Sequence, residues 1–177
     1  HWLRSHDVTM PSTRRLTEIV RQGLTARADS EIRFDLGRIL LRHYRDAFWL
    51  VSHQQPSPPH QLIPWDGDDT LVIDDIGRLQ RRRAAGGMDV GAWRRAPVTV
   101  SFDNTGYRYR PAGRRGSRSF RQLAQESGIP PWRRPLTPII LVGDEVAAVP
   151  GICVCEGFAA SDGSGWAIDW VPFPPQA

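Results

Sequence analysis

The sequence predicts an α+β protein of two small domains, each a mostly antiparallel sheet with one or two helices packed on it. Its 177 residues are enough for one ordinary domain or two small ones. The 15 prolines and 16 glycines indicate many turns, and therefore short strands rather than long helices. Between these turn residues lie short apolar runs with the period of strands, and one stretch in each half has helical spacing.

The helix of the first half is expected to begin at Pro11-Ser12-Thr13, with Ser12 or Thr13 as its N-cap. Four apolar residues then follow at helical spacing and form one stripe: Leu16, Ile19, Val20 and Leu24. The helix should end near residues 28–29. Residues 1–10 should hold the end of an earlier helix and a turn.

Three short strands are expected after this helix, at residues 31–36, 38–44 and 48–51. Gly37 and residues 45–46 supply the turns between them. Residues 48–51 are apolar without a break, which suits a strand buried on both faces. Helix and strands together predict one small α+β unit.

A proline-rich stretch interrupts the pattern after the third strand. Residues 54–60 contain three prolines and no apolar period, which is typical of a semi-rigid linker. We therefore predict a first domain over residues 1–54, a linker over 55–63 and a second domain over 64–177.

The second domain is expected to be one antiparallel sheet with one helix on it. Hairpins are predicted over residues 70–81 and 138–149, the second one turning at Gly143-Asp144. Further strands are predicted at residues 97–102, 107–110, 152–155 and 166–171. A helix over residues 118–127 should end before Gly128, with four residues on its inner side: Phe120, Leu123, Ala124 and Ser127.

Several kinds of chemistry have no signature in this sequence. All 23 cationic residues are arginine, so no lysine is available for a phosphate-binding P-loop or for a Schiff base. No histidine, cysteine or carboxylate pattern matches a metal site. We therefore predict no catalytic residue, metal or cofactor in these 177 residues.

The two cysteines and the N-terminal residues indicate the cellular compartment and whether the chain is part of a longer protein. Cys153 and Cys155 predict two buried thiols in a reducing cytoplasm. We expect neither a signal peptide nor a membrane span. The chain begins with His1 rather than Met, which suggests a piece of a longer protein.

Arginines cluster in residues 108–134, and this cluster is the predicted functional site. Its members are Arg108, Arg110, Arg114, Arg115, Arg118, Arg121, Arg133 and Arg134. A planar guanidinium binds phosphate through two parallel hydrogen bonds. The glycine-flanked loop at residues 113–117 also leads into a helix N-terminus, where unpaired N–H groups attract anions. The cluster therefore predicts contact with a phosphate backbone.

Other interpretations of these arginines stay open. The cluster could be a solvated basic face, and a GC-rich genome alone favours arginine codons. A second run, Arg81-Arg82-Arg83, could extend the same surface or could be solvated charge at the end of a strand.

Three strings in the second half are distinctive: Gly113-Arg-Arg-Gly-Ser-Arg-Ser-Phe-Arg-Gln-Leu, Gly128-Ile-Pro-Pro-Trp-Arg-Arg and Pro138-Ile-Ile-Leu-Val-Gly-Asp-Glu-Val-Ala-Ala-Val-Pro-Gly. In this order and spacing they resemble the C-terminal domain of bacterial tRNA(Ile)-lysidine synthetase. The family often has lysine where this sequence has Ser119 and Gln122. Met10-Pro-Ser, Arg15-Leu-x-x-Ile and Arg42-x-Tyr-Arg resemble the same family's substrate-binding domain.

The resemblance implies a role in holding tRNA. The whole enzyme would use ATP and Mg²⁺ to adenylate an anticodon cytidine of a minor isoleucine tRNA and then attach lysine to it. The family's ATP-binding Ser-Gly-Gly-x-Asp-Ser loop does not occur in this sequence, so this portion should position tRNA without catalysing the reaction. The resemblance implies that six arginines contact RNA: Arg114, Arg115, Arg118, Arg121, Arg133 and Arg134. It implies that Trp132 either has a structural role or stacks on a base.

Two further implications concern partners. The whole enzyme could be a homodimer. The last domain also resembles part of the phenylalanyl-tRNA synthetase β subunit, which suggests an alternative role as a protein-binding scaffold.

Overall fold

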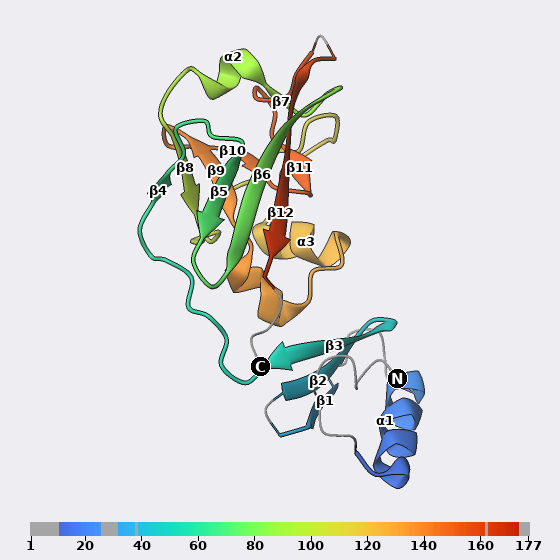
Figure 1. The fold of residues 1–177 in the computed structure, drawn as a ribbon. Helices are drawn as coiled ribbons and strands as arrows, with labels where there is room; N and C mark the ends of the chain where they lie inside the picture. The colour runs from blue at the N-terminus through green and yellow to red at the C-terminus, as the bar shows by residue number, and fades with distance from the viewer. Residues whose placement is uncertain (1–10, 26–31, 38, 162, 174–177) are drawn as a thin grey trace. The chain divides into compact units, whose positions relative to one another are not determined.

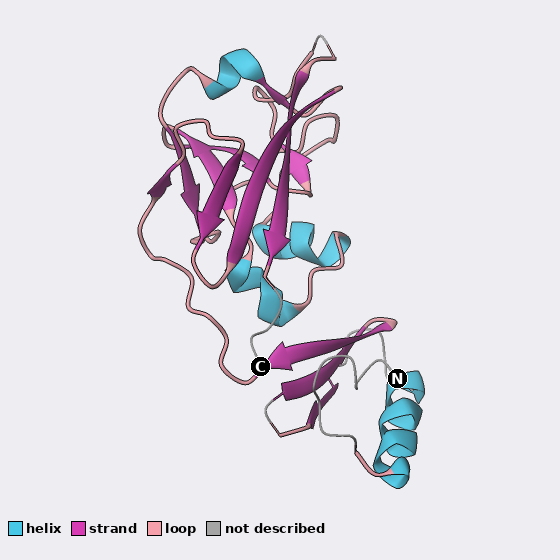
Figure 2. Cartoon of the chain, in the orientation of Figure 1, coloured by secondary structure: helices cyan, strands magenta, loops and turns pink. Residues whose placement is uncertain are grey.

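The computed structural model describes residues 11–25, 32–37, 39–161 and 163–173. The chain divides into two compact units, the first ending at Gln55 and the second comprising Pro56–Phe173. Figure 1 labels the elements of both units, and Figure 2 shows that strands outweigh helices in each. Antiparallel sheets with a few short helices confirm the predicted α+β class.

Unit 1 contains helix α1 (Thr13–Thr25) and a three-stranded antiparallel sheet in the order β1-β2-β3. The strands are β1 (Ile32–Asp35), β2 (Ile39–Tyr44) and β3 (Ala47–Ser52). Ile19 of α1 packs against Leu36, Ile39 and Leu41, so the helix covers one face of the sheet. Ser12 caps the helix, its Oγ accepting from the backbone N–H of Arg15 at 3.4 Å.

Two details of unit 1 differ from the prediction. Val20 is 50% exposed although the helical spacing placed it on the inner stripe. Residues Phe48 to Leu50 are only half-buried, because β3 pairs with β2 alone and α1 covers a single face. The predicted helix end at residues 28–29 and the turn within residues 1–10 lie outside the described residues.

Unit 2 holds two sheets where the sequence suggested one. The five-stranded sheet has the order β11-β10-β9-β8-β4 and the four-stranded sheet has the order β5-β6-β12-β7, with antiparallel pairing throughout. The first sheet contains β4 (Ile63–Pro64), β8 (Val98–Ser101), β9 (Ile139–Val142), β10 (Glu145–Val149) and β11 (Cys153–Val154). The second contains β5 (Thr70–Ile73), β6 (Gly77–Ala84), β7 (Met88–Asp89) and β12 (Gly165–Pro172).

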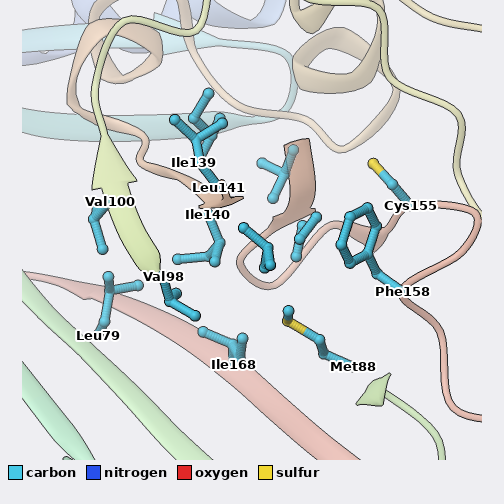
Figure 3. Close-up of a cluster of buried hydrophobic side chains, with 14 of the residues drawn as sticks. Leu79, Met88, Val98, Val100, Ile139, Ile140, Leu141, Cys155, Phe158 and Ile168 are labelled. Carbon is cyan, nitrogen blue, oxygen red and sulfur yellow. The ribbon is translucent and has the colours of Figure 1, made fainter. Parts of the chain in front are cut away.

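The two sheets of unit 2 share one hydrophobic core (Figure 3). Leu79 and Ile168 enter it from the four-stranded sheet, while Val100 and Ile140 enter it from the five-stranded sheet. Apolar alternation predicts that a segment is a strand, but it does not say which sheet the strand joins. That is why the second sheet was missed. The predicted hairpins β5–β6 and β9–β10 are confirmed.

Three short helices complete unit 2: α2 (Val90–Trp93), α3 (Phe120–Glu126) and the 3-10 helix η2 (Pro131–Leu136). Phe120, Leu123 and Ala124 of α3 are buried as predicted, whereas Ser127 is exposed. None of the helices within the described ranges has the length and apolar content to cross a membrane.

Candidate nucleic-acid interface

Residues 107–111 form the base of the arginine-rich segment, and they are extended without forming a regular strand. Tyr109 is fully buried, and its hydroxyl donates to the Asn104 carbonyl at 2.8 Å. Burial raises the pKa of Tyr109, so the phenol stays protonated and remains a donor. Arg108 and Arg110 point to solvent, which matches the predicted alternation of faces.

Isolated bridges replace the expected ladder at this base. Tyr109 and Arg118 exchange two backbone hydrogen bonds of 2.9 and 2.7 Å, and Pro111 pairs with Cys155. Pro111 has no N–H to donate, so the pairing cannot continue as a strand. The chain between the bridges, residues 111–117, forms a closed loop that we name the arginine loop.

The arginine loop presents both of its arginines to solvent. Arg114 and Arg115 are exposed at its tip, and the backbone N–H of Arg114 closes a turn on the Pro111 carbonyl at 3.1 Å. Gly113 and Gly116 have φ angles of +75° and +79°, in the left-handed region that glycine occupies without strain. These glycines therefore let the tip turn sharply.

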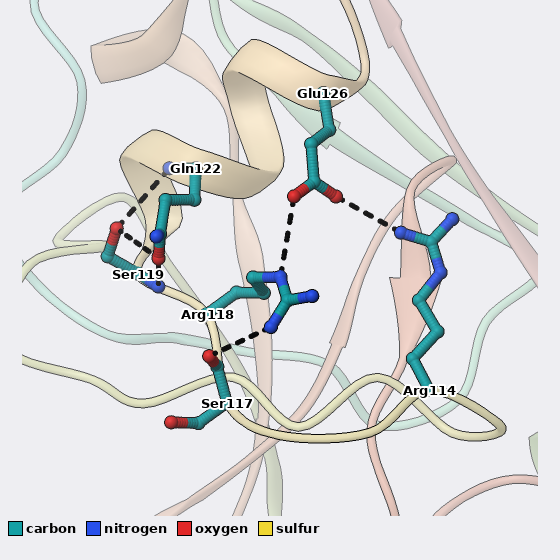
Figure 4. A network of polar contacts seen from close by, with 6 residues as sticks. All are labelled: Arg114, Ser117, Arg118, Ser119, Gln122 and Glu126. Atoms are coloured by element: carbon teal, nitrogen blue, oxygen red, sulfur yellow. Dashed lines mark hydrogen bonds and ion pairs between the residues drawn. The ribbon is translucent and has the colours of Figure 1, made fainter.

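Arg114 and Arg118 converge on one carboxylate, that of Glu126 in α3 (Figure 4). Arg114 Nη1 lies 3.1 Å from Glu126 Oε2, and Arg118 Nε lies 3.4 Å from Glu126 Oε1. The sequence interpretation missed Glu126. No spacing in the sequence indicates this pairing, because Arg114 lies on the loop and Arg118 precedes the first residue of α3.

At the N-terminus of α3, two of the N–H groups that the sequence suggested were unpaired have side-chain partners. Ser119 Oγ accepts from the Gln122 backbone N–H at 3.3 Å, and Gln122 Oε1 accepts from the Ser119 backbone N–H at 2.8 Å. This capping box uses the helix's own side chains where the prediction placed an anion. Arg118 precedes the cap and therefore lies outside the helix, contrary to the predicted start.

The remaining predicted residues divide into exposed and packed. Arg121 is exposed on α3. Arg133 and Arg134 are half-buried in η2, where Arg134 Nε donates to the Ile129 carbonyl at 3.2 Å and burial lowers the pKa of Arg133. Trp132 is only 9% exposed, so its ring is packed into the protein rather than offered to a base.

The second arginine run, Arg81-Arg82-Arg83 on β6, lies in a different environment. The Arg81 side chain is 10% exposed, contacts the rings of Trp93 and Trp166 at 5.0 and 4.2 Å, and donates to the Gly67 carbonyl. Arg83 stacks over Trp166 at 4.0 Å. Arg81 is therefore built into the fold.

A pocket of about 340 Å³ opens beside the arginine loop, with Arg114, Glu126 and Cys153 among its lining residues. Cys153 is half-buried and Cys155 buried, and both are unbridged. The Cys153 thiol donates to the Cys155 sulfur, which favours its protonated form, and this bond together with burial raises the pKa of Cys153. Within the described part of the chain, no group of three or more histidine, cysteine, aspartate or glutamate side chains could hold a metal ion.

Two sequence families match this chain, one in each unit. Residues 1–49 match the family described as the TilS substrate binding domain, and residues 98–170 match the family described as the TilS substrate C-terminal domain. The chain is thus composed of substrate-binding and C-terminal domains rather than of a catalytic domain. The arginine loop and the helices α3 and η2 all lie within the second match.

Curated relatives agree with these domain matches. The chain is 30% identical to the tRNA(Ile)-lysidine synthase of Coxiella burnetii over 97% of its own length and 38% of the relative's. It is 32% identical to that of Serratia proteamaculans over 96% and 38%, and 26% identical to that of Methylococcus capsulatus over 97% and 40%. The chain belongs to the tRNA(Ile)-lysidine synthase family, and it spans about two fifths of the length of these relatives.

Proposed function

We propose that this chain positions tRNA for a ligase that attaches lysine to the anticodon cytidine of a minor isoleucine tRNA. The observation that carries the proposal is the exposed arginine group on the loop and first turns of α3, Arg114, Arg115 and Arg121, within a match to a substrate C-terminal domain. Arg108 and Arg110 add exposed charge at the loop base.

The proposal divides the work between the two units. Residues 1–54 would be the C-terminal part of the substrate-binding domain, 55–63 the linker, and 64–177 the domain that holds tRNA. ATP and Mg²⁺ would act on parts of the enzyme outside these residues, because the sequence contains no Ser-Gly-Gly-x-Asp-Ser loop. The whole enzyme would work in the cytoplasm and could do so as a homodimer.

Guanidinium chemistry supports phosphate contact at this loop. The side chains of Arg115 and Arg121 are exposed and make no hydrogen bond or ion pair within the described residues. A guanidinium with unused donors binds phosphate oxygens bidentately and releases counterions as it does so. Such contacts fix position and affinity but carry no sequence information. The loop would therefore hold tRNA in register while another part of the enzyme selects the nucleotide.

Binding of an isoleucine tRNA to the chain, measured against salt, tests this proposal. If about four arginines contact phosphates, log K should fall with log[salt] with a slope of about −3 to −4. A variant with alanine at Arg114, Arg115, Arg118 and Arg121 should bind about 10- to 100-fold more weakly at low salt.

The matched control replaces four exposed arginines that lie outside the loop and α3: Arg14, Arg78, Arg82 and Arg94. Both variants lose four positive charges, so a role specific to the loop predicts a loss of affinity in the first variant only. If both variants lost the same affinity for tRNA, the loss would come from the lower net charge and not from the loop. Binding that is absent or independent of salt would contradict the tRNA proposal and favour the scaffold alternative.

A further inference from the structure

Glu126 faces two of the arginines that the proposed function gives to RNA. Arg114 lies at the tip of the arginine loop and Arg118 directly follows the loop, and they approach the two different oxygens of this one carboxylate, at 3.1 and 3.4 Å (Figure 4). Arg118 Nη1 also donates to the Ser117 carbonyl at 3.3 Å, which holds its guanidinium toward α3. In the absence of RNA, two guanidiniums are therefore already oriented around a single anionic group, the Glu126 carboxylate.

A backbone phosphate offers the same chemistry as this carboxylate. Each group shares one negative charge between two oxygens that accept charge-assisted hydrogen bonds. Glu126 is therefore where a phosphate would have to be to engage both arginines at once. The pocket lined by Arg114 and Glu126 opens at this point and gives an attached nucleotide room to approach.

The ion pairs are weak enough to exchange. The side chains of Arg114, Arg118 and Glu126 are 63%, 34% and 45% exposed, so water and salt screen their attraction. Glu126 ends the seven-residue helix α3 and is exposed, so its side chain can turn outward without disturbing the core residues Leu123 and Ala124.

We propose that Arg114 and Arg118 form a phosphate subsite that Glu126 occupies when RNA is absent. The proposal rests on the proposed function, and it makes Glu126 an internal competitor of the RNA backbone. In the absence of RNA, Glu126 keeps both guanidiniums in place and lowers the local charge. On binding, the phosphate takes the position between the guanidiniums and the carboxylate turns away. Glu126 therefore sets the affinity of the loop below what its arginines alone would give.

Glu126→Gln tests this competition, because it removes the negative charge while keeping the shape of the side chain. The variant should bind isoleucine tRNA about 3- to 10-fold more tightly than the unaltered chain at low salt, since it neither repels phosphate nor holds the arginines. Glu145→Gln is the matched control: Glu145 is exposed on β10 and pairs with no arginine within the described residues, so its replacement should change affinity less than 2-fold.

A double-mutant cycle locates the effect. With alanine at Arg114 and Arg118, the gain from Glu126→Gln should vanish, because the subsite no longer exists. A Glu126→Gln variant that matches the Glu145→Gln control, or that binds more weakly than the unaltered chain, would overturn the inference. With either of these results, salt-dependent tRNA binding by the unaltered chain would still support the proposed function. If the unaltered chain does not bind tRNA, both the proposed function and the phosphate subsite are wrong. Thermal unfolding of each variant checks that the fold is intact.

Discussion

Two groups of arginines in unit 2 have the same composition and different environments. On β6, Arg81 is enclosed between Trp93 and Trp166, and Arg83 covers the second of these rings. On the arginine loop, Arg114 and Arg115 project from a glycine-flanked tip into solvent. In the sequence, both groups are simply runs of adjacent arginines.

The difference comes from the strand period and from the cross-strand neighbours. Arg81 and Arg83 share the inner face of β6 with Leu79, and their partners on β12 are Ile168 and Trp166. A guanidinium on that face gains from stacking on an indole, and its aliphatic stem covers apolar surface. The two loop arginines are exposed: Arg115 has no partner within the described residues, and Arg114 pairs with the exposed carboxylate of Glu126. Adjacent arginines in a sequence therefore do not by themselves indicate an RNA site, because one such run can pack on indole rings while another is exposed.

The largest effect should come from Arg81→Ala. Loss of two ring contacts and of the bond to the Gly67 carbonyl should destabilise unit 2 by about 2–4 kcal/mol. Thermal unfolding should then shift down by on the order of 10 °C. Arg82→Ala is the control, since Arg82 is 67% exposed in its pair with Asp169 and should matter by less than about 0.5 kcal/mol. Equal shifts in the two variants would erase the contrast between enclosed and exposed arginines.

A smaller effect, of the opposite kind, is expected for Arg115→Ala. Stability should stay within about 0.5 kcal/mol, because the side chain is exposed and unpaired within the described residues. Affinity for tRNA should fall about 2- to 5-fold, and the salt slope should become shallower by about 0.9. Arg115→Lys keeps the charge but loses the planar fork, so it should recover only part of the affinity. If Arg115→Ala lowered stability but left tRNA affinity unchanged, Arg115 would have a structural role like that of Arg81.

The smallest effect extends the comparison to an ion pair of unit 1. Hydrogen bonds from Arg21 and Gln22 lower the pKa of Glu18 from its ordinary 4.5 to about 2. Because the folded pKa is the lower one, the contact stabilises α1 above pH 4.5, and this stabilisation disappears as the pH falls toward 2. NMR titration of the Glu18 carboxyl should give a midpoint near 2, moving toward 4.5 in Arg21→Ala. An unchanged midpoint in that variant would assign the shift to another cause.

Periodicity predicted most of the strands of this fold, and it failed where elements were too short to show a period. Two-residue strands such as Met88–Asp89 and the four-residue α2 carry no repeat that a sequence pattern could detect. The alternation of tyrosine and arginine at residues 107–110 predicted the correct faces, because an extended chain alternates even without a paired neighbour. It did not predict the buried bond from Tyr109 to Asn104.

The candidate site was only partly visible in the sequence, because sequence gives charge but not its partners. Arg114 and Arg118 were identified as basic residues, whereas their pairing with Glu126 depends on how the loop folds back against α3. Arg133 and Arg134 were grouped with them by proximity in sequence, and η2 instead half-buries both. Ser119 and Gln122 form the capping box at the start of α3, a contact that the sequence pattern did not predict.

The bridge at the base of the arginine loop has a consequence for how this surface could change over evolution. Tyr109 and Arg118 join the two ends of the loop, and the buried Tyr109 ties them to the core. The length of the loop tip can therefore change without changing the fold. Doubling the number of loop residues would raise the free energy of loop closure by only about 0.6 kcal/mol. Insertions at Gly113 or Gly116 could add or reposition cationic residues while the sheets keep their packing. The reach of the protein along a nucleic acid could thus be retuned one loop residue at a time.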